Sequence, residues 1–398
     1  MKELILQEAE AIFQESQQHR RWLHAHPEVA FDLTQTLAYV QSALEEIGLE
    51  VTPCGKSGLT ALIGNQPGGK VLLLRADMDA LPIPEESGLS YAATNGNMHA
   101  CGHDIHTAML LGAAKILKKH EDKLNGQIKL MFQPAEEIFS GASDMIEHGI
   151  LENPVPDAGM MIHVAAGVPI PAGSVLIAAP GISAPAADYF TITVKGKSCH
   201  GSMPQQGVDA LNAAAHILIA IQEIQARELG IADHAVMTIG TMQAGHAPNA
   251  IADEAVMRGT IRSFDEEIRA QIKRRITEIS QGIAAAFRAT ATVTYDSGAP
   301  TLINDKAMCD FATMKLRELL GNAAIPVAMI SDGKPSAGGS EDFAYVSQKI
   351  PTVMLSLAAG EPKNGYTYPL HHPKTVFDEQ AMVNGIAAFV YTAIEYLK

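Results

Sequence analysis

The stretch VLLLRADMDALP, residues 71–82, decides the fold class of this chain of 398 residues. A short apolar run that ends in polar residues and proline is typical of a buried strand. Beyond it, strand and helix patterns alternate, with a helix over 104–119 that has Asp104 as its N-cap, a strand over 127–133, a helix near 139–148 and a strand over 158–163. Two further helices are predicted upstream, over 3–23 and 33–47. This alternation predicts an α/β layer with a largely parallel sheet.

A second pattern begins near residue 185. From there to residue 298 the order is strand, helix, strand, strand, helix, strand, which predicts a compact α+β domain of four strands and two helices. The first pattern resumes from about residue 304. We therefore predict an inserted domain over 185–298, within a larger discontinuous domain over 1–184 and 299–398. Two domains also suit the length, because single cores stop growing at roughly 250–300 residues.

Composition excludes several classes of partner. The chain has 29 Lys and Arg against 44 Asp and Glu, a net charge of −15, which argues against binding to nucleic acid or to an anionic membrane. The longest apolar stretch, 168–187, is broken by prolines and cannot form a spanning helix. The first residues lack the pattern of a signal peptide, and four scattered cysteines show no disulfide framework. A cytoplasmic protein that acts on a small molecule is expected.

Donor side chains of the kind that bind metals gather in MHACGHDIH, residues 98–106. Cys101 and His103 are two apart, so in an extended segment they point to the same side and could hold one ion. His106 faces roughly the same way as His103 and is a spare candidate. The alternative interpretation is a polar loop that caps the following helix.

Carboxylates and a histidine follow three successive predicted strands. Glu136 and Glu137 come after the strand over 127–133, His163 ends the strand over 158–163, and Asp77 and Asp79 follow the strand over 71–76. Ligands of open α/β sheets bind at the carboxyl ends of strands, which favours a functional site over a set of solvated carboxylates on the protein surface. Adjacent glutamates allow one to bind an ion while the other acts as a general base in metal-assisted hydrolysis.

The segment PLHHP supplies a distant candidate, His371 or His372. Sulfur, nitrogen and carboxylate donors together suit zinc, manganese, cobalt, nickel or iron rather than calcium or magnesium. Other catalytic motifs are missing from the sequence, which has no G-x-S-x-G elbow and no phosphate-binding glycine loop. The neighbours Cys199 and His200 do not suggest a cysteine hydrolase, because adjacent residues rarely form a Cys–His ion pair.

Seven segments in order resemble the metal-dependent aminoacylase and carboxypeptidase family: RADMDALP, MHACGHDIHTAML, FQPAEE, the histidine that ends MMIH, GTIRSF, GGSEDFAYV and PLHHP. The closest branch is the amidohydrolases that cleave N-acyl amino acids, hippurate and auxin conjugates. The resemblance implies a mixed-sheet α/β catalytic domain with a site for two metal ions. It also implies that the domain over 185–298 is a lid that forms a homodimer.

The resemblance further implies a role for each candidate residue of the larger domain. Cys101 matches a bridging ligand that is an aspartate in the peptidase branches, and the other implied ligands are His103, Glu137, His163 and His371. His371 is preferred to His372, because the metal ligand in this family comes directly after the leucine, here Leu370. Glu136 matches the general base that activates a water and then protonates the leaving amine. Asp79 matches a carboxylate that orients a ligand.

In the inserted domain, His200 resembles a histidine that polarises the scissile carbonyl, often across a dimer interface. Asn249 and Arg262 resemble groups that hold the α-carboxylate of the substrate, and a bidentate arginine suits a planar carboxylate.

We therefore expect an amidohydrolase that uses two divalent ions (manganese, zinc, cobalt or nickel) to cleave N-acetyl or N-benzoyl amino acids. The alternatives are a dipeptidase or carboxypeptidase of the same family and, from another class, a non-catalytic binding module stabilised by metal.

Overall fold

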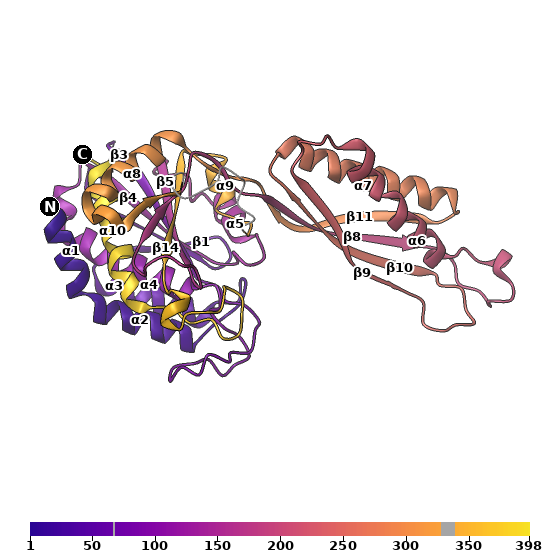
Figure 1. Ribbon diagram of the computed structural model, residues 1–398, viewed down its shortest axis with the longest axis horizontal. Coiled ribbons are helices and arrows are strands. Elements are labelled where there is room, and N and C mark those ends of the chain that lie inside the picture. The colour runs from indigo at the N-terminus through magenta and orange to yellow at the C-terminus, as the bar shows by residue number, and fades with distance from the viewer. Residues whose placement is uncertain (67, 328–338) are drawn as a thin grey trace. The chain divides into compact units, whose positions relative to one another are not determined.

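The computed structural model describes residues 1–66, 68–327 and 339–398, and the chain divides into two compact units (Figure 1). The larger unit is built from the described residues of Met1–Ser183, Ile303–Ser336 and Asp342–Lys398, and the smaller unit from those of Ala184–Leu302 and Ala337–Glu341. Within the described part of the chain, no helix is long and apolar enough to cross a membrane.

An eight-stranded sheet forms the centre of the larger unit, in the order β1-β2-β4-β3-β5-β14-β6-β13. Its strands are β1 (Val51–Cys54), β2 (Gly58–Ile63), β3 (Lys70–Asp77), β4 (Gly126–Gln133), β5 (Ala158–Ala165), β6 (Val175–Ile177), β13 (Ala324–Pro326) and β14 (Thr352–Ala358). The central strands β4, β3, β5 and β14 run parallel, whereas β2 is antiparallel to β4 and β6 is antiparallel to β14. The sheet is therefore mixed, with a parallel centre.

Helices surround this sheet (Figure 1). They are α1 (Lys2–Ala11), α2 (Phe13–Ala25), α3 (Thr34–Glu46), α4 (His103–Lys119), α5 (Gly141–Glu147), α8 (Lys306–Leu320), α9 (Ala344–Ser347) and α10 (Met382–Tyr396). The single helix predicted over 3–23 is wrong in one respect, because Ile12 (φ −95°, ψ 3°) separates α1 from α2. The break lets α2 turn its buried side chains Ser16, Arg20 and Leu23 inward, and α2 packs on α4.

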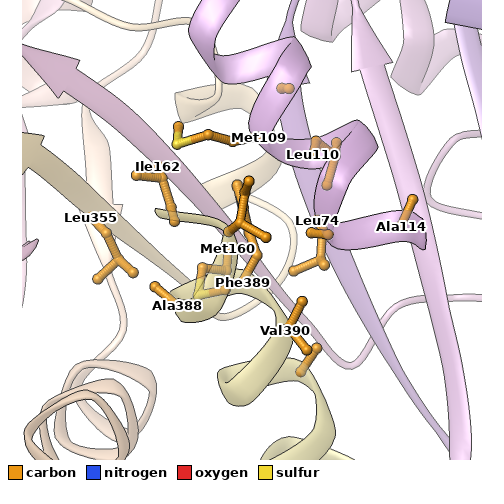
Figure 2. Packing of buried hydrophobic residues seen from close by; sticks show 14 of the residues in the cluster. Leu74, Met109, Leu110, Ala114, Met160, Ile162, Leu355, Ala388, Phe389 and Val390 are labelled. Carbon is orange, nitrogen blue, oxygen red and sulfur yellow. The ribbon is translucent and has the colours of Figure 1, made fainter. Parts of the chain in front are cut away.

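The helices α4 and α10 pack against each other and against the sheet. Figure 2 shows Met109 and Leu110 of α4 beside Met160 of β5 and Phe389 of α10, and all four side chains are fully buried. Burial of one such side chain contributes about 1.5–3 kcal/mol relative to exposure. This core fixes α4, whose first residues follow the MHACG loop, relative to the strands.

The smaller unit has a four-stranded antiparallel sheet in the order β11-β8-β10-β9, with α6 and α7 over one face (Figure 1). Along the chain its elements are β8 (Ala186–Lys195), α6 (Ala210–Ala220), β9 (Ala235–Ala244), β10 (Glu254–Ser263), α7 (Glu266–Ala286) and β11 (Thr290–Ala299). This is the predicted order, and the predicted fold class is confirmed. The segments at the two ends of Ala184–Leu302 contain short strands, β7 (Gly181–Ala184) and β12 (Leu302–Asn304), which pair with each other.

Candidate metal centre

The candidate site lies at one edge of the large sheet, where three parallel strands end. Asp77 is the last residue of β3 and lies opposite Gln133, the last residue of β4, while His163 lies near the end of β5. Because these strands are parallel, the residues that follow them start from the same edge. Glu136 and Glu137 follow β4 at this edge.

Cys101 and His103 of the MHACGHDIH segment reach this edge through a tight turn at Gly102. Gly102 has φ of +86° and is the N-cap of α4, and a Cβ atom there would lie 2.3 Å from Val164 Cγ2. Glycine is required on both grounds, since this backbone conformation and this close approach both exclude a side chain. Asp104 is therefore not the N-cap, contrary to the prediction. Its carboxylate instead binds two side chains of α2, Arg20 Nε at 2.8 Å and His24 Nδ1 at 2.8 Å.

Candidate donor atoms form five overlapping groups among the described residues, and within each group all atoms lie within 4.8 Å of one another. Three groups are made of the predicted ligands and base: Cys101, His103 and His163; Cys101, Glu137 and His371; and His103, Glu136 and Glu137. One of the other two contains Asp77, His103 and His106. The Sγ atom of Cys101 lies 3.5 Å from His163 Nε2 and 3.3 Å from His371 Nε2. Cys101 thus belongs to two groups, as a side chain between two ions would.

Two buried polar atoms in this cluster lack hydrogen-bond partners among the described residues, and they test whether a metal fits. His103 donates from Nδ1 to the carbonyl oxygen of Asp79 (2.8 Å), and its Nε2 has no hydrogen-bond partner, although Asp77 Oδ2 lies 3.5 Å from it. The Oε1 atom of Glu137 also has none and lies 3.8 Å from that Nε2. Buried polar atoms are rarely left unpaired, and sulfur, imidazole and carboxylate together suit a transition metal. The residues fit divalent metal binding.

The ionisation of these groups supports the same conclusion. Burial raises the pKa of Glu137 to about 7, and burial followed by the nearby Glu137 raises the pKa of the Cys101 thiol well above its ordinary value. Burial alone would lower the pKa of His103, but Asp77 and Cys101 raise it well above its ordinary value. The acidic neighbours of His103 thus favour a positive charge in this cluster, which a bound cation would supply.

Asp79 holds the loop that carries both glutamates. Its Oδ1 accepts a hydrogen bond from the backbone N–H of Glu136 (3.0 Å) and its Oδ2 accepts one from that of Glu137 (3.2 Å). The side chain of Asp79 is buried, and its backbone carbonyl receives the His103 bond. One residue therefore orients an imidazole and both glutamates.

A buried ionic network lies beside these residues. Arg75 donates to Asp77 Oδ2 (2.7 Å), to Gln133 Oε1 (2.9 Å) and to Asp342 Oδ1 (3.2 Å), and all four side chains are buried. Burial raises the pKa of Asp77, but Arg75, His103 and His106 outweigh burial and hold it well below its ordinary value. Neither Arg75 nor Asp342 is among the predicted site residues, although they lie in the segments RADMDALP and GGSEDFAYV.

The two remaining histidine alternatives occupy different positions. His106 has both ring nitrogens engaged, with Asp77 Oδ1 at 2.5 Å from Nδ1 and the Val164 N–H at 2.8 Å from Nε2, so neither is available as a donor to metal. Burial lowers the pKa of His106 to about 4. His372 stacks on Tyr368 and accepts the Lys374 N–H at Nδ1. His371 instead belongs to the donor group with Cys101 and Glu137.

The smaller unit brings two of its three candidate residues together. The segments around His200 and Asn249 pair with each other. The Gly201 N–H donates to the Asn249 carbonyl oxygen (2.8 Å), and His200 and Ala250 form an isolated antiparallel β-bridge. The His200 side chain is exposed, and its Nδ1 accepts the Ser202 N–H at 3.2 Å, which leaves the proton on Nε2. Arg262 lies on β10 with its guanidinium 5.5 Å from the ring of Tyr189.

Fold and donor set together define a metal-dependent hydrolase, and comparison with known proteins gives the family. Residues 73–395 match the model of peptidase family M20/M25/M40, and the chain belongs to this family. N-acetyl-L-cysteine deacetylase of Bacillus subtilis is 38% identical over 95% of this chain and 87% of its own. IAA-amino acid hydrolase ILR1-like 2 of Arabidopsis thaliana is 35% identical over 95% of this chain and 84% of its own.

A solved structure of the Bacillus subtilis YXEP protein, described as a dinuclear metal binding peptidase from the M20 family, has a TM-score of 0.76 at 32% identity. The match covers 98% of this chain and 99% of that one. The predicted family is confirmed, as is the prediction of a hydrolase that acts on amide bonds. Divalent metal binding is supported by this neighbour and by the donor groups.

Proposed function

We propose that this chain removes the acyl group from N-acyl amino acids of the N-acetyl or N-benzoyl type, and so releases a carboxylic acid and a free amino acid. The observation that carries the proposal is the position of Glu136, which belongs to a donor group with His103 and Glu137 and is itself buried. A base next to a metal site is what amide hydrolysis requires. The described activities of the deacetylase and of the IAA-amino acid hydrolase support an N-acyl amino acid as substrate.

In this proposal, two divalent ions (manganese, zinc, cobalt or nickel) are held by five residues: Cys101, His103, Glu137, His163 and His371. When bound, the ions supply Lewis acidity that polarises the amide carbonyl and increases the acidity of a water molecule. Glu136 accepts a proton from the attacking water and donates it to the nitrogen of the leaving amino acid. Asp79 keeps Glu136 in place through the backbone bond of 3.0 Å.

The smaller unit is proposed to bind the rest of the substrate. His200, with its proton on Nε2, donates a hydrogen bond to the carbonyl oxygen as negative charge develops there. Arg262 and Asn249 bind the α-carboxylate, which explains how a chain with a net charge of −15 accepts an anionic substrate.

The test is a panel of N-acetyl, N-benzoyl and longer N-acyl amino acids, together with dipeptides. Protein stripped of metal is resupplied with manganese, cobalt, zinc or nickel, and free amino acid is measured. We expect metal-dependent release from acyl amino acids that exceeds release from dipeptides. Protein that binds two ions and cleaves none of the acyl amino acids would overturn the proposal.

A dipeptidase or carboxypeptidase activity is the second candidate, because the similar solved structure is described as a peptidase. The same panel separates the two functions. Faster release from dipeptides than from any acyl amino acid would favour the peptidase.

We further propose that the protein is a homodimer formed through the smaller unit. Strand β9 is an edge strand of the four-stranded sheet, and α6 exposes Leu211 (47% exposed) and Ile219 (71%), which are eight residues apart and so share a helix face. Sedimentation of wild type and Ile219→Lys tests this, with a dimer expected for wild type and a weaker dimer for the variant. A monomeric wild type at micromolar concentration would overturn it.

A cytoplasmic location is also proposed. All four cysteines are free thiols, three of them buried, which suits a reducing compartment. Fractionation of the cells that produce the protein tests this, and activity outside the cytoplasmic fraction would contradict it.

A further inference from the structure

His106 lies among the candidate ligands without belonging to the proposed set. It is buried on the first turns of α4, and its ring centroid lies 5.3 Å from that of His103 and 4.5 Å from that of His163. By residue type and distance it could be taken for a metal ligand. Its hydrogen bonds give it another role.

The two hydrogen bonds of His106 fix its tautomer. The backbone N–H of Val164 can only donate, so His106 Nε2 at 2.8 Å must accept. The ring proton is therefore on Nδ1, which donates to Asp77 Oδ1 at 2.5 Å. Both nitrogens are used within the protein, and the imidazole acts as a rigid spacer between a carboxylate and a backbone amide.

This spacer connects β3 with the two elements, α4 and β5, that carry His103 and His163 of the Cys101, His103 and His163 group. Asp77 ends β3 and is itself held by Arg75 Nη1 at 2.7 Å, His106 follows His103 by one helical turn on α4, and Val164 follows His163 on β5. A shift of His106 therefore moves the backbone next to His163 relative to the helix that carries His103.

The second donor group, Cys101, Glu137 and His371, is held by contacts that do not involve His106. The backbone of Glu137 is bound by the Asp79 carboxylate at 3.2 Å, and the N–H of His371 donates to Ala100 O at 3.0 Å. Cys101 alone is common to the two groups.

We propose that His106 is a positioning residue that sets the geometry of only one of two metal subsites, the one formed by Cys101, His103 and His163. The inference rests on the two-metal site of the proposed function. It predicts that the two subsites respond differently to a change at residue 106.

Three variants of the full-length protein test this. His106→Ala removes both hydrogen bonds, His106→Asn keeps a donor near the Nδ1 position, and His106→Gln keeps an acceptor near the Nε2 position. Metal-stripped protein is titrated with manganese and zinc by calorimetry, and bound metal is counted by mass spectrometry without substrate. For His106→Ala we expect one dissociation constant to rise about 10–100-fold and the other to stay as in wild type. The Asn and Gln variants should lie between.

His120→Gln is the matched control. His120 is a buried histidine directly after α4, at the end of the helix opposite His103, where its Nε2 contacts Glu8 at 2.7 Å. The control is expected to lower the melting temperature and to leave both metal affinities unchanged. A thermal melt of every variant separates loss of fold from loss of one subsite.

Two results would overturn the inference. One is a His106→Ala variant that binds two ions with the wild-type affinities. The other is an equal loss of affinity for both ions in the folded His106→Asn and His106→Gln variants. Failure of the two-metal site itself is seen separately, because wild type would then bind fewer than two ions.

Discussion

The Nε2 atom of His371 lies 3.3 Å from the Sγ atom of Cys101, although 270 residues separate them in sequence. The adjacent His372 instead stacks on Tyr368, with ring centroids 4.4 Å apart. This pair of neighbours offers a matched comparison. We expect His371→Ala to lose one of two bound ions and to lower kcat/KM at least about 100-fold, since even residues behind a ligand affect metal affinity by 10–100-fold.

His372→Ala should keep both ions and stay within a few fold of wild-type activity. Metal counting and initial rates check both variants together. A His372→Ala variant that loses an ion while His371→Ala keeps two would reverse the assignment.

Glu136→Gln removes the proposed base and keeps nearly the same shape. We expect kcat to fall by about 10²–10⁴-fold, the range of general acid–base catalysis, while both ions remain bound. Glu137→Gln is the comparison, because its carboxylate belongs to the Cys101 and His371 group, and it should lose metal as well as activity. Equal kcat values for wild type and Glu136→Gln at saturating metal would contradict the assignment.

Asp79→Asn tests how the glutamate loop is held. The carboxylate accepts from two backbone N–H groups, whereas an amide offers one oxygen and one NH₂ group. One N–H therefore loses its acceptor, which costs about 1–3 kcal/mol in free energy of unfolding. Urea unfolding of metal-free protein measures this loss. A variant as stable as wild type would show that water accepts the hydrogen bond of the N–H that lost its carboxylate acceptor.

Glu379 gives a dependence of stability on pH away from the metal centre. It binds Arg21 Nη2 at 2.7 Å and Arg20 Nη1 at 3.1 Å. Burial raises its pKa, but the Arg21 hydrogen bond and the charges of Arg20 and Arg21 outweigh burial and lower it below 4.5. A lowered carboxyl pKa stabilises the fold above the unfolded pKa, and this contribution is lost as the pH falls through the folded pKa.

Glu379→Gln should therefore reduce the free energy of unfolding by about 1–3 kcal/mol at pH 7. The difference from wild type should begin to shrink at about pH 4.5, where Glu379 of the unfolded chain becomes protonated, and should be lost as the pH falls through the lower folded pKa. Urea titrations between about pH 2.5 and pH 7 check this. A difference that grows as the pH falls would contradict the ionic explanation.

Removal of metal should destabilise the larger unit. Ions that bind only the folded chain add about 2.7 kcal/mol when their free concentration is 100 times the dissociation constant. We expect chelator to lower the melting temperature, and manganese, zinc, cobalt or nickel to restore it. Calcium and magnesium should not restore it at the same concentration, because thiolate and imidazole donors disfavour them.

The parts of the site that are local in sequence could be predicted. Glu137 follows a strand with a clear apolar pattern, so its strand-end position could be inferred from periodicity. Cys101 and His103 lie two residues apart just before one predicted helix, so their proximity could be inferred from the sequence. The larger fold could be predicted for the same reason, since its strands and helices alternate regularly. These are features that a window of ten to twenty residues contains.

Contacts between distant segments could not be predicted in this way. Asp104 has the sequence position of an N-cap, but Arg20 and His24 bind its carboxylate from a helix about eighty residues earlier. Nothing near Asp104 in sequence signals those partners. The same holds for the bond from Arg75 to Asp342, which needs the completed sheet.

The order of residues along the chain has a consequence for synthesis. Cys101, His103, Glu137 and His163 leave the ribosome early, whereas strand β14, helix α10 and His371 follow only after the inserted smaller unit has been made. A nascent chain therefore contains a thiol, two imidazoles and a carboxylate before its sheet is complete and before the last proposed ligand has been made. With the proposed ligand set, loading of both ions would be completed late, and a chain that meets a tightly binding ion such as copper during synthesis would be at risk of capturing it first.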